Sequence, residues 1–384
     1  MIFPSIHTSR AHLRNVYSFE DIIRAYLKCK KHKGNRASVR QFDAQYLFYL
    51  QKLWYDINHE IYQISPSTTF IVTYPKPREV WAAAFVDRIV HHLIYDSVVD
   101  FYHPRFIHTN CACIPGKGTD FAVNYALKFA RSVTQDWTKT AYILKFDIHN
   151  FFVSINKEIL WNILVHDLSD DTLTMRLFKQ IIFNDPTQNA IIIHPEDINK
   201  VPYHKSLWHT DKLHGLAIGD LPNQLCAAGI FLDGLDKRIV HKLKCSEYVR
   251  YVDDGILFST DYYRLVDIRD DIDEWLLKNR ELHLSKDKTY IAKIENGFDF
   301  VGKHIHPYRK YIRNMTKNKA YTTVDQLIRH PYNKHFQDAV NSYFGMMRHT
   351  DSFNIRRNIA TAIDIYCPNL YTDTECTKIM TYPK

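Results

Sequence analysis

Residues 248–259 read Tyr-Val-Arg-Tyr-Val-Asp-Asp-Gly-Ile-Leu-Phe-Ser. Apolar and polar residues alternate on both sides of Asp253 and Asp254, which is typical of two strands, and the Asp-Gly pair favours a tight turn. The stretch therefore predicts a β-hairpin with two adjacent carboxylates at its tip. Two like charges held side by side repel each other, so this tip needs a compensating cation, and a divalent metal ion is the natural one.

A third carboxylate follows a second predicted strand. Residues 141–155 read Ala-Tyr-Ile-Leu-Lys-Phe-Asp-Ile-His-Asn-Phe-Phe-Val-Ser-Ile, in which the alternation runs into Asp147. Three carboxylates on neighbouring strands can hold two Mg²⁺ ions roughly 3.5–4 Å apart, one activating an attacking hydroxyl and one stabilising a leaving pyrophosphate. The pattern predicts nucleotidyl transfer. Each piece alone is also typical of a solvated turn or a cap, so the other motifs of the chain decide between the two interpretations.

The composition fits a polyanionic partner. The 384 residues include 50 Lys and Arg against 42 Asp and Glu, a net charge of +8, and 14% of them are aromatic. Basic proteins bind nucleic acid and exposed rings stack on bases, although a ribosomal or a membrane-surface protein would carry a similar charge. The sequence has no run of 18 apolar residues and no signal-peptide pattern, which predicts a cytoplasmic protein without a membrane partner. Its seven cysteines show neither a disulfide framework nor zinc-ligand spacing.

Six further motifs surround the hairpin in a fixed order, and together they resemble those of a reverse transcriptase. The resemblance covers the chain from about residue 70 to about residue 360. In chain order the motifs are 73–80 with 87–92, 113–119, Asp147 with Phe151 and Phe152, 215–224, 282–289 and 298–302. Any one of them is weak evidence, whereas their order favours the family strongly.

The resemblance implies an α+β fold with the right-hand architecture of polymerases. Its parts would be an N-terminal helical, basic extension (1–70), fingers (71–140), a palm of antiparallel sheet and helices with the catalytic acids (141–305), a helical thumb (306–366) and a tail (367–384). Residues 183–213 are expected to form a long inserted loop with a short strand at 190–193, to which no role is assigned.

A basic stretch lies between the expected N-terminal helices. It either contacts the phosphates of a template RNA or is a solvated loop. Its members are Lys28, Lys30, Lys31, Lys33, Arg36 and Arg40.

Within the prokaryotic group II intron, retron and diversity-generating retroelement type, the chain is most similar to the enzymes of diversity-generating retroelements. Most reverse transcriptases open the motif before the hairpin with Gln-Gly, whereas this chain has Ile218-Gly219 and ends the motif with Asn223-Gln224. The runs 75–83 and 341–349 also resemble that subgroup, although it normally has Ser-Gln where this chain has Asn223-Gln224.

The family resemblance implies RNA-directed DNA polymerase activity, in which a template RNA is copied into cDNA from a primer with dNTPs. The subgroup implies errors at template adenines, as in mutagenic retrohoming, and a small, basic, oligomeric accessory protein as partner. A retron-like or defence-associated reverse transcriptase is the alternative. A non-catalytic, maturase-type RNA-binding protein is less favoured because all three acids are present, and a ribosomal-type protein would not explain the order of the motifs.

Roles for individual residues follow from the chemistry and the resemblance together. Asp147, Asp253, Asp254 and the backbone carbonyl of Ile148 are expected to bind two Mg²⁺ ions, for which Mn²⁺ could substitute. The first acid of the hairpin pair is expected to be the more direct ligand. Residues expected to contact the nucleotide are Lys76, Arg78, Arg88, Phe152, Ile218, Gly219, Gln224 and Lys288. Residues expected to contact template or primer are Lys117, Tyr251, Gly302, Arg313 and Arg348.

Four of the nucleotide contacts carry specific expectations. The Phe152 ring would exclude a ribose 2′-hydroxyl, unless it is a plain core residue. Lys288 would protonate the departing pyrophosphate or contact the duplex backbone, and Arg88 would bind triphosphate or pair with Asp87. Ile218 replaces a hydrogen-bonding Gln, and a lost contact of about 1–3 kcal/mol lowers discrimination about tenfold to a hundredfold.

Overall fold

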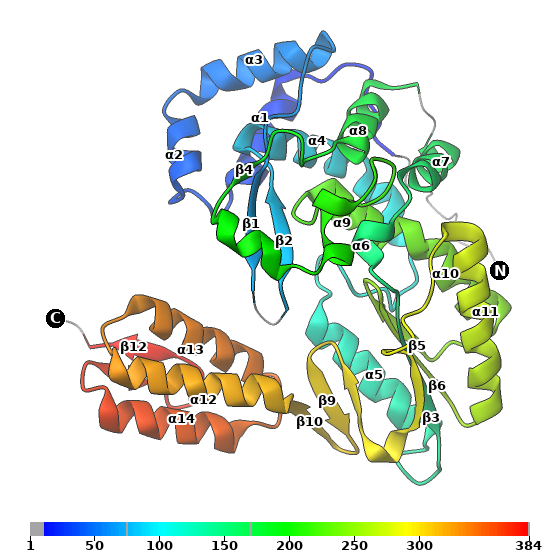
Figure 1. The fold of residues 1–384 in the computed structure, drawn as a ribbon, viewed down its shortest axis with the longest axis vertical. Helices are drawn as coiled ribbons and strands as arrows, with labels where there is room; N and C mark the ends of the chain where they lie inside the picture. Colours follow the sequence, from blue (N-terminus) through cyan, green and yellow to red (C-terminus); the bar gives the residue numbers. More distant parts are fainter. Residues whose placement is uncertain (1–10, 74–75, 169–170, 383–384) are drawn as a thin grey trace, which may run out of the picture.

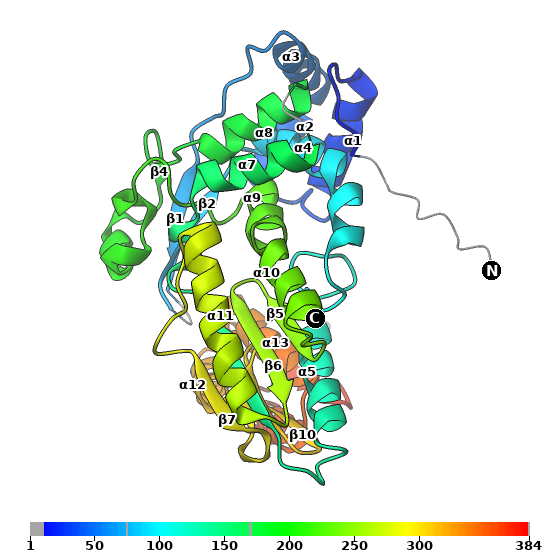
Figure 2. The same ribbon diagram turned by 90° about the vertical axis from the view of Figure 1, so that its right-hand side faces the viewer.

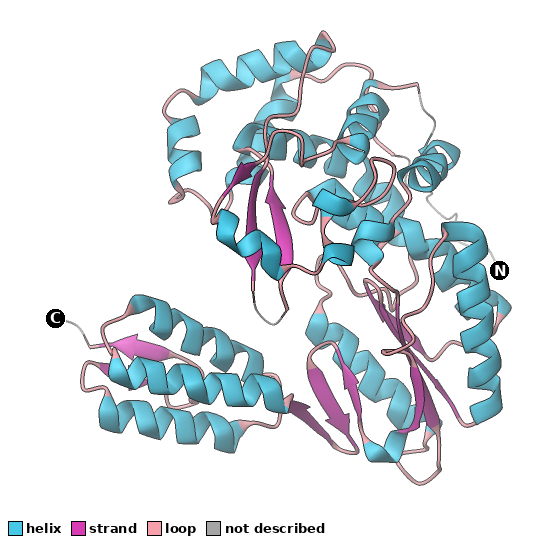
Figure 3. Cartoon of the chain, in the orientation of Figure 1, coloured by secondary structure: helices cyan, strands magenta, loops and turns pink. Residues whose placement is uncertain are grey.

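The computed structural model describes residues 11–73, 76–168 and 171–382. It has a mixed α/β architecture of helices and antiparallel sheets, in agreement with the α+β class (Figure 1, Figure 3). No helix in these ranges is both long and apolar enough to cross a lipid bilayer.

The central sheet carries the hairpin and has the strand order β5-β6-β3-β7, with every neighbouring pair antiparallel. Its strands are β3 (Tyr142–Asp147), β5 (Tyr248–Tyr251), β6 (Asp254–Ser259) and β7 (Tyr290–Lys293). The register places Asp147 directly opposite Asp254. The two stretches that predicted strands are therefore neighbours, and their acids meet at one end of the sheet.

Helices cover both faces of this sheet, and each side-chain row of β3 contributes a buried apolar residue to the core on its own face. Leu144 packs in one core with α11 (Tyr262–Arg280), whereas Ile143 packs in a second core with α5 (Thr119–Val133). Figure 2 shows β5 and β6 between these two helices. Asp261 begins α11 by accepting a hydrogen bond from the backbone N–H of Arg264, which satisfies a free helix donor.

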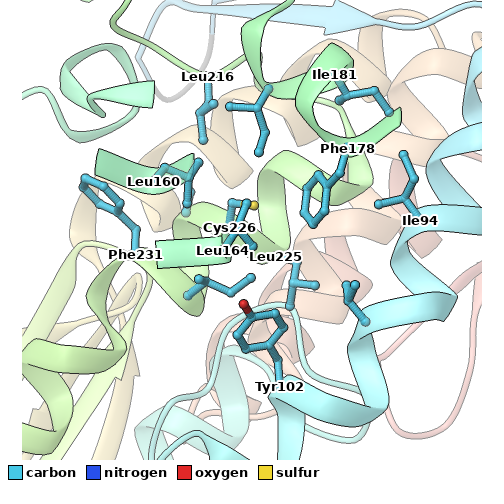
Figure 4. Close-up of a cluster of buried hydrophobic side chains, with 14 of the residues drawn as sticks. Ile94, Tyr102, Leu160, Leu164, Phe178, Ile181, Leu216, Leu225, Cys226 and Phe231 are labelled. Atoms are coloured by element: carbon cyan, nitrogen blue, oxygen red, sulfur yellow. The ribbon is translucent and has the colours of Figure 1, made fainter. Parts of the chain in front are cut away.

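A helical layer lies beyond the acid-bearing end of the sheet. It is built from α4 (Phe85–Tyr102), α6 (Phe151–Ser154), α7 (Lys157–Leu168), α8 (Leu173–Phe183), α9 (Leu221–Ala228) and α10 (Asp233–Lys237). Figure 4 shows its apolar centre, where Ile94, Leu164, Phe178, Leu225 and Phe231 converge from five different segments. Short 3-10 segments at His103–Arg105 and Ile230–Leu232 and a π-turn at Arg238–Lys242 connect these helices.

The N-terminal helices α1 (Phe19–Lys30), α2 (Ala37–Asp43) and α3 (Tyr46–Asn58) pack against α4, as the helical pattern of this region predicted. Two of the basic residues there form ion pairs, Lys28 with Asp96 at 2.7 Å and Lys30 with Asp43 at 2.5 Å. A small sheet of order β2-β1-β4 follows, formed by β1 (Thr68–Val72), β2 (Arg78–Ala82) and β4 (Ile191–Ile192).

The C-terminal part has its own apolar core. A sheet of order β10-β9-β8 leads into a bundle of α12 (Asn314–Arg329), α13 (Lys334–Met347) and α14 (Phe353–Tyr366). The strands of that sheet are β8 (Phe298–Phe300), β9 (Lys303–His306) and β10 (Arg309–Ile312), and β8 follows a 3-10 turn at Ile294–Asn296. The bundle core includes Leu327, Phe344 and Ile363.

The segment after Tyr366 differs from the expected tail. Strands β11 (Leu370–Thr372) and β12 (Ile379–Thr381) pair antiparallel, and Leu370 and Ile379 are buried in the bundle core. The short pattern of apolar residues in this segment was too sparse to predict strands, but burial against a bundle already formed supplies the missing hydrophobic stabilisation.

Candidate active site

The turn of the β5–β6 hairpin lies two residues earlier than the sequence predicted. Tyr251 pairs with Asp254, so the two-residue turn is Val252-Asp253 rather than Asp254-Gly255. Val252 has φ +59°, and a positive φ at the first turn position is typical of a type II′ turn, where glycine is preferred. A β-branched residue is strained in this conformation. The hairpin therefore presents Asp253 at the cost of backbone strain.

Arg250, on β5, stabilises this turn through a buried hydrogen-bond network. Its guanidinium is fully buried and donates to the carbonyl oxygens of Val252 (2.7 Å) and Ala228 (2.8 Å). It also forms a two-pronged ion pair with Asp236 at 2.7 and 2.5 Å, and Tyr248 donates to the same carboxylate at 2.9 Å. Removing one partner of such a buried pair costs about 3–5 kcal/mol. The network holds the turn that carries Asp253.

The three predicted acids occupy different electrostatic environments. Lys145 on β3 forms an ion pair with Asp254 at 2.9 Å, and Lys288 forms one with Asp147 at 2.5 Å. Asp253 has no ion pair with any residue that the structure describes. Burial, and then the charge of Asp147, raise the pKa of Asp253 to about 6. Among the three acids, Asp253 is therefore the one whose negative charge no ion pair balances.

The oxygen donors at this end of the sheet fit Mg²⁺. In the described ranges, no three His, Cys, Asp or Glu side chains gather closely enough to hold a metal ion by themselves. Mg²⁺, however, is usually bound by one or two carboxylates together with substrate phosphates and water. Burial is the first cause of the raised pKa of Asp253 and the charge of Asp147 the second, and a bound cation would oppose both effects. The carbonyl of Asp147 accepts a backbone hydrogen bond, and the N–H of His149 donates one. The Ile148 carbonyl lies between these two groups and accepts no backbone hydrogen bond from the residues that the structure describes.

The motif at 218–219 lies against the small sheet. The backbone N–H of Trp81 donates to the Ile218 carbonyl at 2.9 Å. Gly219 has φ +138°, and a Cβ there would lie 2.2 Å from the Trp81 oxygen, so only glycine fits. The Phe152 carbonyl accepts from the N–H of Leu216 at 2.9 Å. These backbone contacts hold the segment that contains Ile218 and Gly219 between Trp81 and Phe152, and Phe152 follows shortly after the end of β3.

Phe152 and Gln224 adjoin this motif. The Phe152 ring is half-buried and makes an edge contact with Phe151 at 5.6 Å between centroids. This position leaves both the sugar-selecting and the core interpretation open. Gln224, in the first turn of α9, donates its backbone N–H to Asp220, and its side chain is half-buried.

The predicted phosphate-binding cations are not all brought together. Lys76 and Arg78 are exposed on the β1–β2 hairpin and form no ion pair within the described ranges. Arg88 instead donates to the Ala83 carbonyl at 2.7 Å, on the first turn of α4. Its positive charge lowers the pKa of the neighbouring Asp87 against the stronger, raising effect of burial. Arg88 is therefore engaged with the helix start rather than with the acid end of the sheet.

The residues predicted to contact template or primer are spread over several elements. Lys117 donates to the carbonyls of His108 (2.6 Å) and Asn110 (3.3 Å), which fixes a loop. Gly302 is at the exposed tip of the β8–β9 hairpin with φ +81°. Arg313 pairs with Asp299 at 3.3 Å. Further positions are Tyr251 at the end of β5 and Arg348 at the end of α13, where it lines a cavity of about 270 Å³.

Four side chains near this site were not anticipated: Lys145, Arg250, Glu79 and Lys205. Lys145 precedes Asp147 by two residues, and the two-residue period of a strand puts both side chains on one face of the sheet. The sequence could therefore have predicted that Lys145 lies near the acids. The Arg250–Asp236 ion pair joins residues of two separate segments, so no local sequence pattern predicts it.

No protein-family model matches the chain, and no curated protein does.

Proposed function

We propose that the chain is an RNA-directed DNA polymerase with the right-hand organisation of fingers, palm and thumb. One observation carries the proposal: Asp147 and Asp254 are register partners on β3 and β6, and the strained turn beside them presents Asp253. The three carboxylates thus belong to the same end of the sheet, and Lys145 and Lys288 form ion pairs with two of them. This arrangement supports two-metal nucleotidyl transfer.

Asp147, Asp253 and the Ile148 carbonyl would hold the metal ions, with Asp254 tied to Lys145 as the less direct ligand. When bound, Mg²⁺ supplies charge neutralisation for the attacking hydroxyl and the leaving pyrophosphate. Lys288 forms an ion pair with Asp147, and this position beside an expected metal ligand supports its proposed role as the group that would protonate the pyrophosphate. Phe152 would border the sugar, and Lys76 and Arg78 would neutralise phosphate oxygens.

The finer proposal is error-prone copying of a template RNA, as in diversity-generating retroelements. Its support is Ile218, whose carbonyl is used by Trp81 and whose hydrocarbon side chain offers a nucleotide no hydrogen bond. A retron-like or defence-associated enzyme would share the chemistry but copy its RNA faithfully. A small basic accessory protein belongs to the same proposal.

Primer extension on a defined RNA template, with Mg²⁺ and dNTPs, tests both the proposed polymerase activity and the finer proposal of error-prone copying. Asp253→Ala should reduce cDNA synthesis at least ~100-fold, because metal stabilisation contributes several kcal/mol. The matched control is Asp267→Ala, an exposed acid on α11, which should leave synthesis unchanged. Extension that survives Asp253→Ala would contradict the polymerase assignment. Sequencing the wild-type cDNA separates errors at template adenines from faithful copying, and faithful copying would remove the finer proposal.

A further inference from the structure

The segment between α8 and α9, for which the sequence indicated no role, is built onto the small sheet. Strand β4 pairs in parallel with β1, and Ile191 and Ile193 donate backbone hydrogen bonds to Ser67 and Thr69 at 2.9 Å. Three 3-10 turns follow, at Pro195–Lys200, Tyr203–Lys205 and Leu207–His209. The segment therefore extends the sheet that carries Lys76 and Arg78.

A buried carboxylate anchors the last of these turns. Glu79 on β2 is 4% exposed, and its Oε2 accepts from the backbone N–H of Leu207 at 2.9 Å. The same oxygen accepts from the Trp81 indole at 3.3 Å, and the rings of Trp81 and Trp208 lie 5.3 Å apart. Because a buried carboxylate must be hydrogen-bonded, Glu79 and the turn stabilise each other. The backbone around Ser206 is thus fixed relative to β2.

This anchor places Lys205 among the charged groups of the candidate site. Desolvation and the charges of Lys288, Lys76 and Arg78 lower the pKa of Lys205, and the charge of Asp147 opposes them. These groups come from three separate parts of the chain. Because the backbone of Leu207 is hydrogen-bonded to Glu79, the residue after Arg78, the turn that carries Lys205 lies beside the β1–β2 hairpin.

The cations in this group outnumber the anions. Only Lys288 is neutralised, by its ion pair with Asp147. Within the part of the chain that the structure describes, Lys76, Arg78 and Lys205 form no ion pair and no hydrogen bond through their side chains. Like charges on neighbouring elements repel, so an anion with several charges would stabilise this arrangement.

We propose that Lys205 binds the triphosphate of the incoming nucleotide beside Lys76 and Arg78, so that the segment 184–213 is part of the nucleotide site. The inference rests on the proposed polymerase function. The triphosphate is favoured over a template phosphate because the charge of Asp147, the acid expected to share a metal ion with the nucleotide, also acts on Lys205.

Steady-state primer extension gives the first test. Lys205→Ala should raise the KM for dNTP roughly tenfold, the size of one charge-assisted contact, with the KM for primer–template unchanged. Lys205→Arg should retain most of the affinity. Lys200→Ala is the matched control, because Lys200 lies in the same segment but pairs with Asp197 at 2.5 Å. A change confined to the KM for primer–template would overturn the proposal in favour of a backbone-phosphate contact.

Calorimetric binding of inorganic tripolyphosphate to the full chain gives a second test without catalysis. The wild type and Lys200→Ala should bind it equally, and Lys205→Ala roughly tenfold more weakly. Equal binding by all three proteins would overturn the proposal even if the wild type synthesises cDNA. Binding that depends on Lys205 in a protein that extends no primer would support the anion site and contradict the polymerase function. The two failures are therefore distinguishable.

Discussion

Asp220, next to the glycine that contacts Trp81, is a buried acid that forms no ion pair with a Lys or Arg among the residues that the structure describes. Its side chain lies 3.8 Å from Nδ1 of His91, but burial lowers the pKa of His91 to about 3, so the imidazole is neutral. Burial, and then the charge of Asp87, raise the pKa of Asp220 to about 7 against the opposing charge of Arg88. The folded protein therefore favours the protonated form of the Asp220 carboxyl more strongly than the unfolded chain does.

Asp220→Asn should consequently stabilise the protein at high pH. A raised folded-state pKa means that stability is fully present below the usual pKa of 3.8 and is lost as the pH rises through about 7. The free energy of unfolding should increase by about 2–4 kcal/mol at pH 8 and be unchanged at pH 4. Urea denaturation at the two pH values measures it, and an equal effect at both would contradict the burial argument.

At the same scale, clear alternation in the sequence predicted the strands that Asp147 ends and Asp254 begins, and Asp253 lies in the turn next to Asp254. The sequence did not locate Lys205 or Glu79, since their roles depend on a loop folding back onto a strand more than 100 residues earlier. It placed Arg88 with the phosphate-binding cations, whereas a nearby carbonyl holds its guanidinium. Side-chain destinations of this kind are set by tertiary contacts.

At the scale of an element, the sequence predicted the strands of the β5–β6 hairpin but not the position of its turn. Alternation predicted both strands, but the Asp-Gly pair was assigned to the turn, and it begins β6 instead. Gly255 is required by its neighbour: a Cβ there would lie 2.2 Å from the Phe146 ring on β3. A glycine that makes room for an aromatic ring on the adjacent strand is a packing feature that single-strand patterns do not contain.

Gly255→Ala should therefore destabilise the protein by about 1–3 kcal/mol through overpacking. In a Phe146→Ala background the same change should cost much less, with a coupling energy of about 1–3 kcal/mol. The control is Gly345→Ala in α13, where nothing lies within 4 Å of an added Cβ and helix propensity favours alanine. Denaturation of the four proteins of this cycle measures the coupling, and additive costs would be inconsistent with the Phe146 contact.

The whole molecule contains more than one apolar core. The helical bundle and β11–β12 share a core that contains no residue of the central sheet or of α11. The family resemblance predicted a separate helical thumb from motif order. The strand pair that completes its core was not predicted, because three-residue strands are too short to show a period.

Phe344→Ala should test the independence of this bundle. Truncating the fully buried ring should cost about 3–5 kcal/mol and lower the melting temperature of one calorimetric transition. Leu276→Ala, a buried change on α11 in the main core, should shift a different transition. Displacement of both transitions by either variant would indicate a single cooperative unit.

The topology of the central sheet also has a consequence for the nascent chain. Strand β3 is complete once residue 147 has been synthesised, but its partners β6 and β7 come roughly 100 residues later or more. At about 5–20 residues per second, translation leaves β3 without a partner on either edge for roughly 5–20 s. An unpaired apolar strand is an aggregation hazard, and a charge within it acts as a gatekeeper. Lys145 is the charge in the middle of this run, so the residue that pairs with Asp254 in the folded protein is also expected to protect the strand from aggregation during synthesis.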